Sequence, residues 1–429
     1  MRLGGRLEGA ISVLEDIDAR RRPVADALKD WGLAHRFAGS GDRAAIGNIV
    51  YDALRMRLSH AWLMDDDSAS AIAHAVMFRQ WGFTPETLAA ELADDKFAPA
   101  ALSEATLSAF HSRDLKDAPS HIQGDIPEWI QPTFEKSFGD TWLREAQALA
   151  ERPTLDLRAN ILKASREKAV KALERSGAQE ASIARYGIRI AAGEGASRLP
   201  NVTAELSFQK GWFEVQDEGS QIVADLVLPQ DGEQVLDYCA GGGGKTLAMS
   251  AAMHNKGQVH AYDADRKRLA PIIERLKRAG TRNVQVHDNA KALKALEDRC
   301  DKVLVDAPCT GTGTWRRRPD TKWRLTAKNL DERTAQQQDA LKQASAYVRP
   351  GGELIYVTCS VLPQENEDQV RAFTAANPEF AISGALEGWD QLYGKDSPHP
   401  RSSDGQTITL TPASTDTDGF FFCRMKRKA

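Results

Sequence analysis

The sequence of 429 residues predicts a multidomain protein that combines three architectures. Residues 1–118 repeat apolar positions at helical spacing, which predicts an all-α bundle, and residues 119–150 continue as a helical linker interrupted by prolines. Residues 151–211 hold strand, helix and strand patterns, which predicts a small α+β module. Residues 212–429 alternate buried-strand and helix patterns, which predicts a C-terminal α/β domain with an open, mostly parallel sheet.

The N-terminal bundle is clearest in "SGDRAAIGNIVYDALRMRL", residues 40–58. Ser40 or Asp42 can cap the start of a helix there. Apolar residues then recur on one helical face: Ile46, Ile49, Val50, Ala53, Leu54 and Leu58. Taken alone, this pattern indicates helices that pack together and assigns them no further role.

Five strand patterns organise the C-terminal domain. They are "EQVLDY" (233–238), "GQVHAYD" (257–263), "VQVHD" (284–288), "DKVLVDAP" (301–308) and "GELIYVTC" (352–359). Helical patterns such as "KTLAMSAAM" and "DRKRLAPIIERLKRAG" lie between them. Because ligands of open α/β sheets bind beyond the carboxyl ends of the strands, the residues that end these strands are the candidates for a site.

The composition argues against several classes of protein. A net charge of −4 does not suit a chain that coats nucleic acid over its whole surface, although a local basic groove stays possible. No run of about 18 apolar residues is present, and the acidic residues near the N-terminus do not suit a signal peptide. The five cysteines form no C-x-x-C pair, which argues against zinc and indicates reduced thiols in a cytoplasmic protein. We therefore expect no metal and no membrane.

A glycine loop follows the first strand of this domain in "VLDYCAGGGGKT", residues 235–246. Glycines let the backbone approach a ligand closely, and the start of a helix offers free N–H groups. A P-loop would need glycine at Cys239, and a dinucleotide fingerprint beginning at Gly241 would need glycine or alanine at Thr246. Both patterns fail, which leaves a loop for a nucleoside, as in enzymes that use S-adenosylmethionine.

Three carboxylates end the strands that follow the loop. Asp263 ends the second strand, where an acid can accept hydrogen bonds from both ribose hydroxyls, Asp288 ends the third and Asp306 the fourth. Each aspartate alone could equally be a solvated strand end or a helix cap. The residues expected to contact the cofactor are Cys239, Ala240, Gly241, Gly242, Gly243, Gly244, Lys245, Asp263, Asp288 and Asp306.

Two cysteines also stand at strand ends. Cys309 lies in "VDAPCTGTGTW" (305–315) and Cys359 in "LIYVTCSVLPQENE" (354–367). A buried cysteine is usually inert, but methyl transfer to C5 of a cytosine gives two thiols a purpose. A thiolate that adds to C6 turns C5 into a nucleophile, and the thiol must leave again once the C5 proton is lost. Asp306 is then the candidate to stabilise the adduct through N3 or the exocyclic amine.

Several motifs together resemble one family. "DYCAGGGGKT", "DAPCTGTG", "RRRPDTKW" and "VTCSVLPQENE" are similar to the RsmB/Sun-type RNA cytosine-5 methyltransferases, and "DRAAIGNIVYDALR" resembles the NusB-like domain of the members that act on bacterial ribosomal RNA. The resemblance implies a Rossmann-like methyltransferase domain, an RRM-like module at 151–211 and a NusB-like RNA-binding domain at 1–118. Gly242 stands where the family usually has proline, which predicts a more flexible loop.

The resemblance also implies roles for the site residues. Cys359 would be the nucleophile, Cys309 would assist release of the methylated base, and S-adenosyl-L-methionine would be the methyl donor. The implied substrate is 16S ribosomal RNA, with transfer RNA as the nearest alternative. A non-catalytic RNA-binding ribosome assembly factor is the alternative from another class. We expect a monomer.

The segment "WRRRPDTKWR", residues 315–324, is the candidate RNA contact. Its cations can bind phosphates and its indoles can stack on unpaired bases, although such a charge run is also typical of a solvated face. The residues expected to bind RNA are Arg316, Arg317, Arg318, Lys322, Trp323 and Arg324. Because C5 and C6 must be reached, the target cytosine is expected to be flipped out or in a loop.

Overall fold

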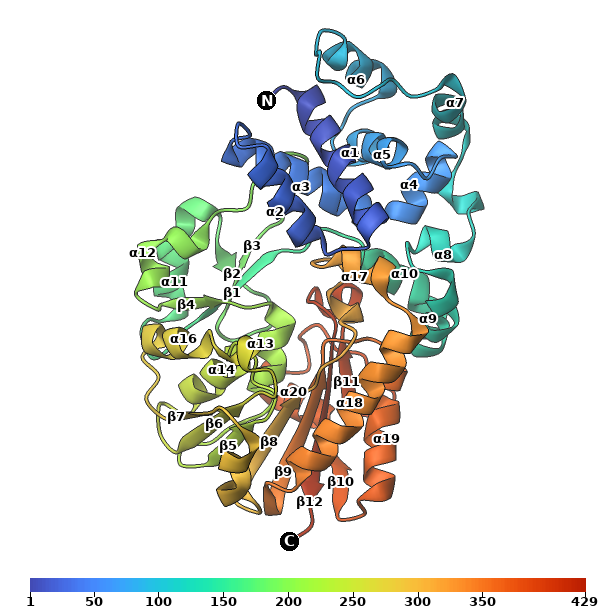
Figure 1. Cartoon of the computed structure of the whole chain (residues 1–429). Coiled ribbons are helices and arrows are strands. Elements are labelled where there is room, and N and C mark those ends of the chain that lie inside the picture. Colours follow the sequence, from blue (N-terminus) through green and yellow to red (C-terminus); the bar gives the residue numbers. More distant parts are fainter. The chain divides into compact units, whose positions relative to one another are not determined.

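The computed structural model describes residues 1–429 and divides into two compact units (Figure 1). The helical unit comprises Met1–Pro153, Ala192–Leu199 and Trp315–Leu325. The α/β unit comprises Thr154–Ala191, Pro200–Thr314 and Thr326–Ala429. No helix in either unit combines the length and the apolar character that crossing a membrane requires.

The helical unit confirms the predicted N-terminal helices. α3 (Ser40–Arg55) is capped by Gly39 and not by Ser40 or Asp42, and Asp42 inside its first turn accepts from the Gly39 N–H at 3.1 Å. Ile46 and Val50 on its apolar face are fully buried in the core, which α1 (Leu3–Arg20) and α5 (Ala69–Arg79) complete. The other helices of this unit are α2 (Val24–Ala34), α4 (Arg57–Met64), α6 (Pro85–Leu92), α7 (Glu104–Ser112), α8 (Ser120–Gln123), α9 (Gln131–Phe138), α10 (Trp142–Ala148) and α17 (Pro319–Arg324).

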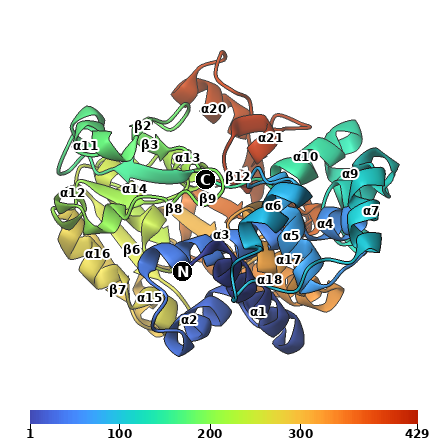
Figure 2. The same cartoon turned by 90° about the horizontal axis from the view of Figure 1, so that it is seen from above.

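The α/β unit begins with the predicted small α+β module. Its antiparallel sheet has the order β2-β3-β1-β4, and Figure 2 shows α11 beside β2 and β3. Leu157, Ile188 and Phe213 fill its core. The last strand lies just beyond the predicted end of the module at residue 211. The elements are β1 (Leu155–Ala159), α11 (Arg166–Ala172), β2 (Gln179–Glu180), β3 (Gly187–Ile190), α12 (Leu206–Gln209) and β4 (Phe213–Val215).

The large sheet has the order β10-β12-β9-β8-β5-β6-β7, with β11 paired to β12. The strands from β5 to β9 are parallel, as the sequence predicted, while β12 runs antiparallel to β9, β10 and β11. The strands are β5 (Gln234–Asp237), β6 (Gln258–Tyr262), β7 (Val284–His287), β8 (Cys300–Asp306), β9 (Val348–Thr358), β10 (Phe380–Ser383), β11 (Thr407–Leu410) and β12 (Phe420–Arg427).

Helices cover both faces of this sheet, so its central strands β5 and β8 are mostly buried and read as nearly continuous apolar runs. On one face Leu341 and Phe373 share a buried apolar cluster with residues of β8 and β9, and on the other Val223, Met249 and Trp389 share a second cluster. The helices are α13 (Glu218–Asp225), α14 (Gly244–Ala252), α15 (Arg266–Leu269), α16 (Ile272–Ala279), α18 (Ala327–Ser345), α19 (Glu367–Ala376), α20 (Ala385–Tyr393) and α21 (Pro412–Thr415).

Candidate active site

The glycine loop connects β5 to α14 and depends on backbone conformations that favour glycine. Gly241 has φ +50° and Gly243 has φ +82°. A Cβ atom at Gly243 would lie 2.5 Å from Ile272 Cγ1, so a side chain there would force α16 away. The Ala240 N–H donates to Tyr262 O at 2.8 Å, which fixes the loop to the end of β6. The loop thereby leads into the start of α14, where helix N–H groups can bind a ligand.

Asp263 lies against this loop, whereas Asp288 does not. The buried Asp263 accepts hydrogen bonds from the Gly241 N–H at 2.9 Å and the Asp265 N–H at 2.8 Å. Asp288, just beyond β7, is exposed and accepts from Asn289 Nδ2 at 2.6 Å. Both remain candidates for a nucleoside, and only Asp263 contacts the loop.

Asp237, the last residue of β5, is a site residue that the sequence analysis missed. It is fully buried, Thr246 Oγ1 donates to its Oδ2 at 2.6 Å, and its Oδ1 has no hydrogen-bond partner. Burial raises its pKa to about 7, with Asp306 adding to the shift and Thr246 opposing it. Asp237 ends a strand just as Asp263 does, so the same argument applied to it. The position of Asp237 inside "VLDYCAGGGGKT" was the sequence signal that could have identified it.

Lys245 and Asp306 form an ion pair at the same edge of the sheet. Lys245 Nζ lies 2.7 Å from Asp306 Oδ2, and the side chains are 8% and 30% exposed. Burial alone would lower the pKa of Lys245, but the charge and hydrogen bond of Asp306 outweigh it and the pKa is raised. The cation is therefore held beside the strand that leads to Cys309.

The structure brings Cys309 and Cys359 into direct contact. Their Sγ atoms are 3.2 Å apart, and both residues are partly exposed. The hydrogen bond with Cys359 and burial together raise the pKa of Cys309 well above its usual value, so this sulfur stays protonated near neutral pH. One thiol can donate to the other sulfur in this geometry.

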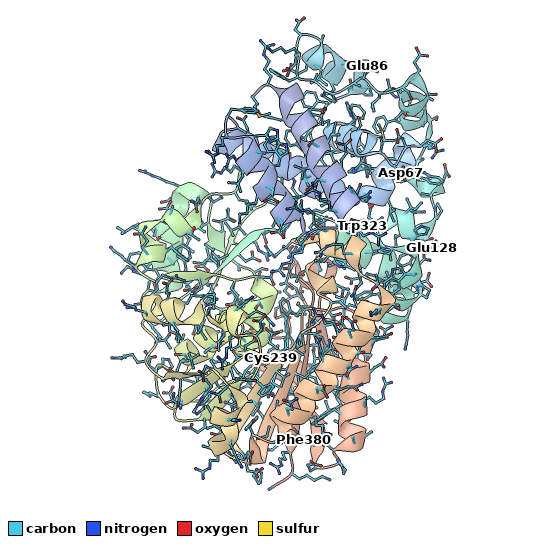
Figure 3. All side chains as sticks on the ribbon, in the orientation of Figure 1. Asp67, Glu86, Glu128, Cys239, Trp323 and Phe380 are labelled. Carbon is cyan, nitrogen blue, oxygen red and sulfur yellow. The ribbon has the colours of Figure 1, made fainter.

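The other cysteines are placed differently. Cys239 lies in the glycine loop (Figure 3), and burial raises its pKa well above the usual value, so it is not a reactive thiolate. Cys300 and Cys423 are fully buried in the core of the large sheet.

The basic segment lies mostly within the core of the helical unit, contrary to its predicted role as an open RNA contact. Lys322 is 1% exposed and donates to Arg55 O at 2.9 Å, and Arg316 is 3% exposed. Trp323 (Figure 3) donates from Nε1 to Leu54 O at 2.7 Å, and Trp315 is buried. Lys322 and Trp323 fasten the segment to α3, while the ring of Trp315 stacks on Phe134 of α9.

The remaining cations of the segment differ in exposure. Arg318 and Arg324 are exposed, and Arg324 pairs with Asp320 at 2.7 Å. Arg317 is partly buried. Of the six predicted RNA contacts, the structure therefore leaves Arg318 and Arg324 at the surface.

Two family descriptions match the α/β part of the chain and the helices before it. Residues 224–426 match "16S rRNA methyltransferase RsmB/F". Residues 126–194 match "Methyltr_RsmF/B-like, ferredoxin-like domain". The second match covers most of the predicted RRM-like module.

Curated relatives and solved structures agree with these matches. Ribosomal RNA small subunit methyltransferase B of Cronobacter sakazakii is 34% identical over 306 residues, and that of Yersinia pseudotuberculosis is 32% identical over 307. Each match covers 70% of this chain and 66% of the relative's length. The crystal structure of PH0851 aligns over 100% of this chain and 99% of its own, with TM-score 0.73 and 23% identity. A methyltransferase homologue from Pyrococcus horikoshii aligns over 72% and 97%, with TM-score 0.59 and 25% identity.

The parallel sheet, with a glycine loop after β5 and acids at the ends of β5, β6 and β8, defines a Rossmann-like methyltransferase domain. The matched domain descriptions and the curated relatives identify the family within this class of methyltransferase. The chain belongs to the RsmB/F, or Sun-type, methyltransferase family, as the motifs indicated. The chain spans about two thirds of the length of the curated relatives it matches.

Proposed function

We propose that this chain methylates C5 of a cytosine in RNA, using S-adenosylmethionine and a transient bond between Cys359 and C6 of the base. The observation that carries the proposal is the contact between Cys309 and Cys359, 3.2 Å from sulfur to sulfur. A nucleophile that must bond to carbon and then leave benefits from a second proton-bearing group at contact distance. Two thiols at one sheet edge, beside a nucleoside loop, supply that arrangement.

The residues around the glycine loop suit the proposed cofactor. Bound S-adenosylmethionine supplies a methyl group on an electrophilic sulfonium. In the loop, the Gly241 N–H already donates to Asp263 and the Gly243 N–H to Ala240 O, so the N–H groups at the start of α14 are the ones that can face the ligand. The buried carboxylate of Asp263 can accept from the ribose hydroxyls. Asp237 Oδ1, buried without a hydrogen-bond partner, is an acceptor that a donor on the ligand would satisfy.

The contact geometry suits Cys359 as the attacking sulfur, with Cys309 as its partner. Because the pKa of Cys309 is raised, Cys309 can act as a thiol that donates to Cys359 Sγ and later assists its departure. Lys245 occupies Oδ2 of Asp306, which leaves Oδ1 to accept a hydrogen bond from the exocyclic amine of the base. The target cytosine must leave its stack to reach these groups.

We propose small-subunit ribosomal RNA as the substrate. The curated relatives at 34% and 32% identity carry that substrate in their names, and "DRAAIGNIVYDALR" resembles the NusB-like domain of ribosomal RNA members. A ribosomal substrate would place the protein in the cytoplasm.

The test is transfer of labelled methyl from S-adenosylmethionine to purified 16S ribosomal RNA and, separately, to transfer RNA. We expect 5-methylcytosine in the 16S RNA with the native protein, and none with Cys359→Ala. Cys300→Ala, which removes a thiol from the core, is the matched control and should keep activity. Labelling of transfer RNA alone would show that transfer RNA, and not ribosomal RNA, is the substrate. Labelling of neither RNA would favour a non-catalytic assembly factor.

A further inference from the structure

A buried carboxylate, Glu365, lies next to the Cys309 loop and has no part in the chemistry described above. It belongs to the 3₁₀ turn Pro363–Glu365, which follows Cys359 in the chain, and it is 0% exposed. Its Oε1 accepts from the Thr310 N–H at 2.8 Å, and its Oε2 accepts from Thr310 Oγ1 at 2.5 Å. Both oxygens therefore bind the residue directly after Cys309.

Gln337 extends this contact to the other side of Cys309. This fully buried residue of α18 donates from Nε2 to Glu365 Oε1 at 3.0 Å and to Pro308 O at 3.0 Å. The two neighbours of Cys309 in the chain are thus tied to one carboxylate. Tyr356 Oη donates to the Glu365 backbone oxygen at 2.6 Å, which anchors the turn itself to β9.

Burying the Glu365 carboxylate costs free energy, which indicates that the side chain has a role at this place. The three donors to the Glu365 side chain are neutral groups, and a carboxylate held only by neutral donors is expensive to desolvate. Glutamine in its place would have one accepting oxygen and would turn an NH2 group toward a donor. The site therefore selects a group that accepts at both ends.

We propose that Glu365 is a positioning residue that holds Cys309 at contact distance from Cys359, and so controls the release step rather than the first bond to the base. This inference rests on the proposed function for its catalytic meaning. The geometric part of the proposal is that Glu365 sets the distance between the two sulfur atoms. This part can be tested on the protein without RNA or cofactor. The charge of Glu365 also helps to raise the pKa of Cys309, which favours the protonated thiol.

The first test follows the covalent intermediate with Glu365→Gln and 16S RNA. We expect a bond to the base to form at nearly the native rate in a single turnover, while release slows about tenfold and a slow-migrating protein–RNA band accumulates. Glu367→Gln is the matched control, because it makes the same substitution two residues away, at the start of α19. Native-like release in Glu365→Gln would overturn the proposal.

The second test needs neither RNA nor cofactor, so it separates this inference from the proposed function. Diamide takes two electrons and two protons from a pair of thiols, which join as a disulfide, and mass spectrometry of peptides reports the Cys309–Cys359 bond. We expect this bond to form at least several-fold more slowly in Glu365→Gln than in the native protein and in Glu367→Gln, although loss of the Glu365 charge by itself makes the Cys309 thiol easier to ionise. Equal rates would overturn the positioning role, whatever the protein does with RNA.

A third variant protects the test against a folding defect. If circular dichroism shows that Glu365→Gln is unfolded, Thr310→Val keeps the Thr310 N–H bond to Oε1 and removes only the 2.5 Å hydroxyl bond. It should slow disulfide formation and adduct release in the same direction by a smaller factor. A folded Thr310→Val protein with native rates in both assays would contradict the proposal.

Discussion

Arg275 Nη1 donates a 2.5 Å hydrogen bond to the carbonyl oxygen of Gly242, in the middle of the glycine loop. Glu214 on β4 orients this arginine, with Oε2 3.1 Å from Nε and 3.0 Å from Nη2. The family usually has proline at position 242, and four consecutive glycines suggested a loop of greater freedom. Arg275, which lies outside the loop, therefore restrains a loop whose own four glycines do not make it stiff.

Replacing Arg275 by alanine should therefore weaken binding of S-adenosylmethionine. Without the bond to Gly242 O, the loop must be ordered by the ligand, and that cost reduces affinity. We expect the dissociation constant, measured by isothermal titration calorimetry, to rise about tenfold. Lys277→Ala on the exposed side of the same helix is the control and should bind as the native protein does.

The same idea predicts a rescue. A Cβ at position 242 would lie 3.1 Å from Arg275 Nη1, so proline meets crowding in the native chain and finds room once the arginine is shortened. Gly242→Pro combined with Arg275→Ala should bind the cofactor more tightly than Arg275→Ala alone. Equal affinities for the two would show that loop stiffness is not what Arg275 provides.

Breaking the pair of Lys245 and Asp306 should destabilise the protein as well as stop methyl transfer. Asp306→Asn leaves a buried cation without its partner, and we expect a loss of about 2 kcal/mol in the free energy of unfolding, measured in urea. The double variant with Lys245→Met removes the stranded charge and should be more stable than Asp306→Asn alone. Simple additivity of the two changes would mean that the pair is not coupled.

Asp237 should give the protein a pH-dependent stability. Its folded pKa of about 7 is higher than its value in an unfolded chain, so the folded protein binds the proton more tightly. The resulting stability is complete below about pH 4 and is lost as pH rises through 7. Asp237→Asn cannot lose this proton, so its advantage over the native protein should grow by up to about 4 kcal/mol between pH 4 and pH 8. Parallel urea-unfolding curves for both proteins across that range would contradict the assigned ionisation.

The fold was predictable because its strongest signals are local. The parallel strands are short apolar runs that end in Asp237, Asp263 or Asp306, and β5, β6 and β8 were found at those places. The antiparallel edge was missed: "GFFFCRM", which forms most of β12, is absent from the five predicted strand patterns, since a lone apolar run does not reveal its partner strands.

The positions of the candidate site residues were predictable where a residue stands at a strand end. Cys309 and Cys359 are 50 positions apart in the sequence, and only the adjacent parallel strands β8 and β9 bring them together. The basic segment was a different case, because a run of cations looks the same whether it faces water or packs against helices. The carbonyls of Leu54 and Arg55 that receive Trp323 and Lys322 depend on tertiary packing that no local pattern encodes.

That packing predicts different effects for buried and exposed members of the basic segment. Arg318→Ala, at an exposed position, should weaken RNA binding and lower the slope of affinity against salt concentration by about one. Trp323→Phe loses the bond to Leu54 O and should cost about 1 kcal/mol of unfolding free energy without changing that slope. Both slopes are measured by filter binding. A lower slope of RNA affinity against salt concentration for Trp323→Phe would indicate that the Trp323 indole lies in the RNA-binding surface.

Removing the sulfur of Cys309 should trap the reaction halfway. Cys359 can still bond to C6 in Cys309→Ala, but the partner that assists its departure is gone, so a stable protein–RNA band should appear on a denaturing gel. The native protein should show little of this band, and Cys359→Ala none, because no bond to the base can form. A band with Cys359→Ala but not with Cys309→Ala would exchange the roles of the two sulfurs. The 3.2 Å contact makes that exchange geometrically possible, so the gel decides between two assignments that the distance alone permits.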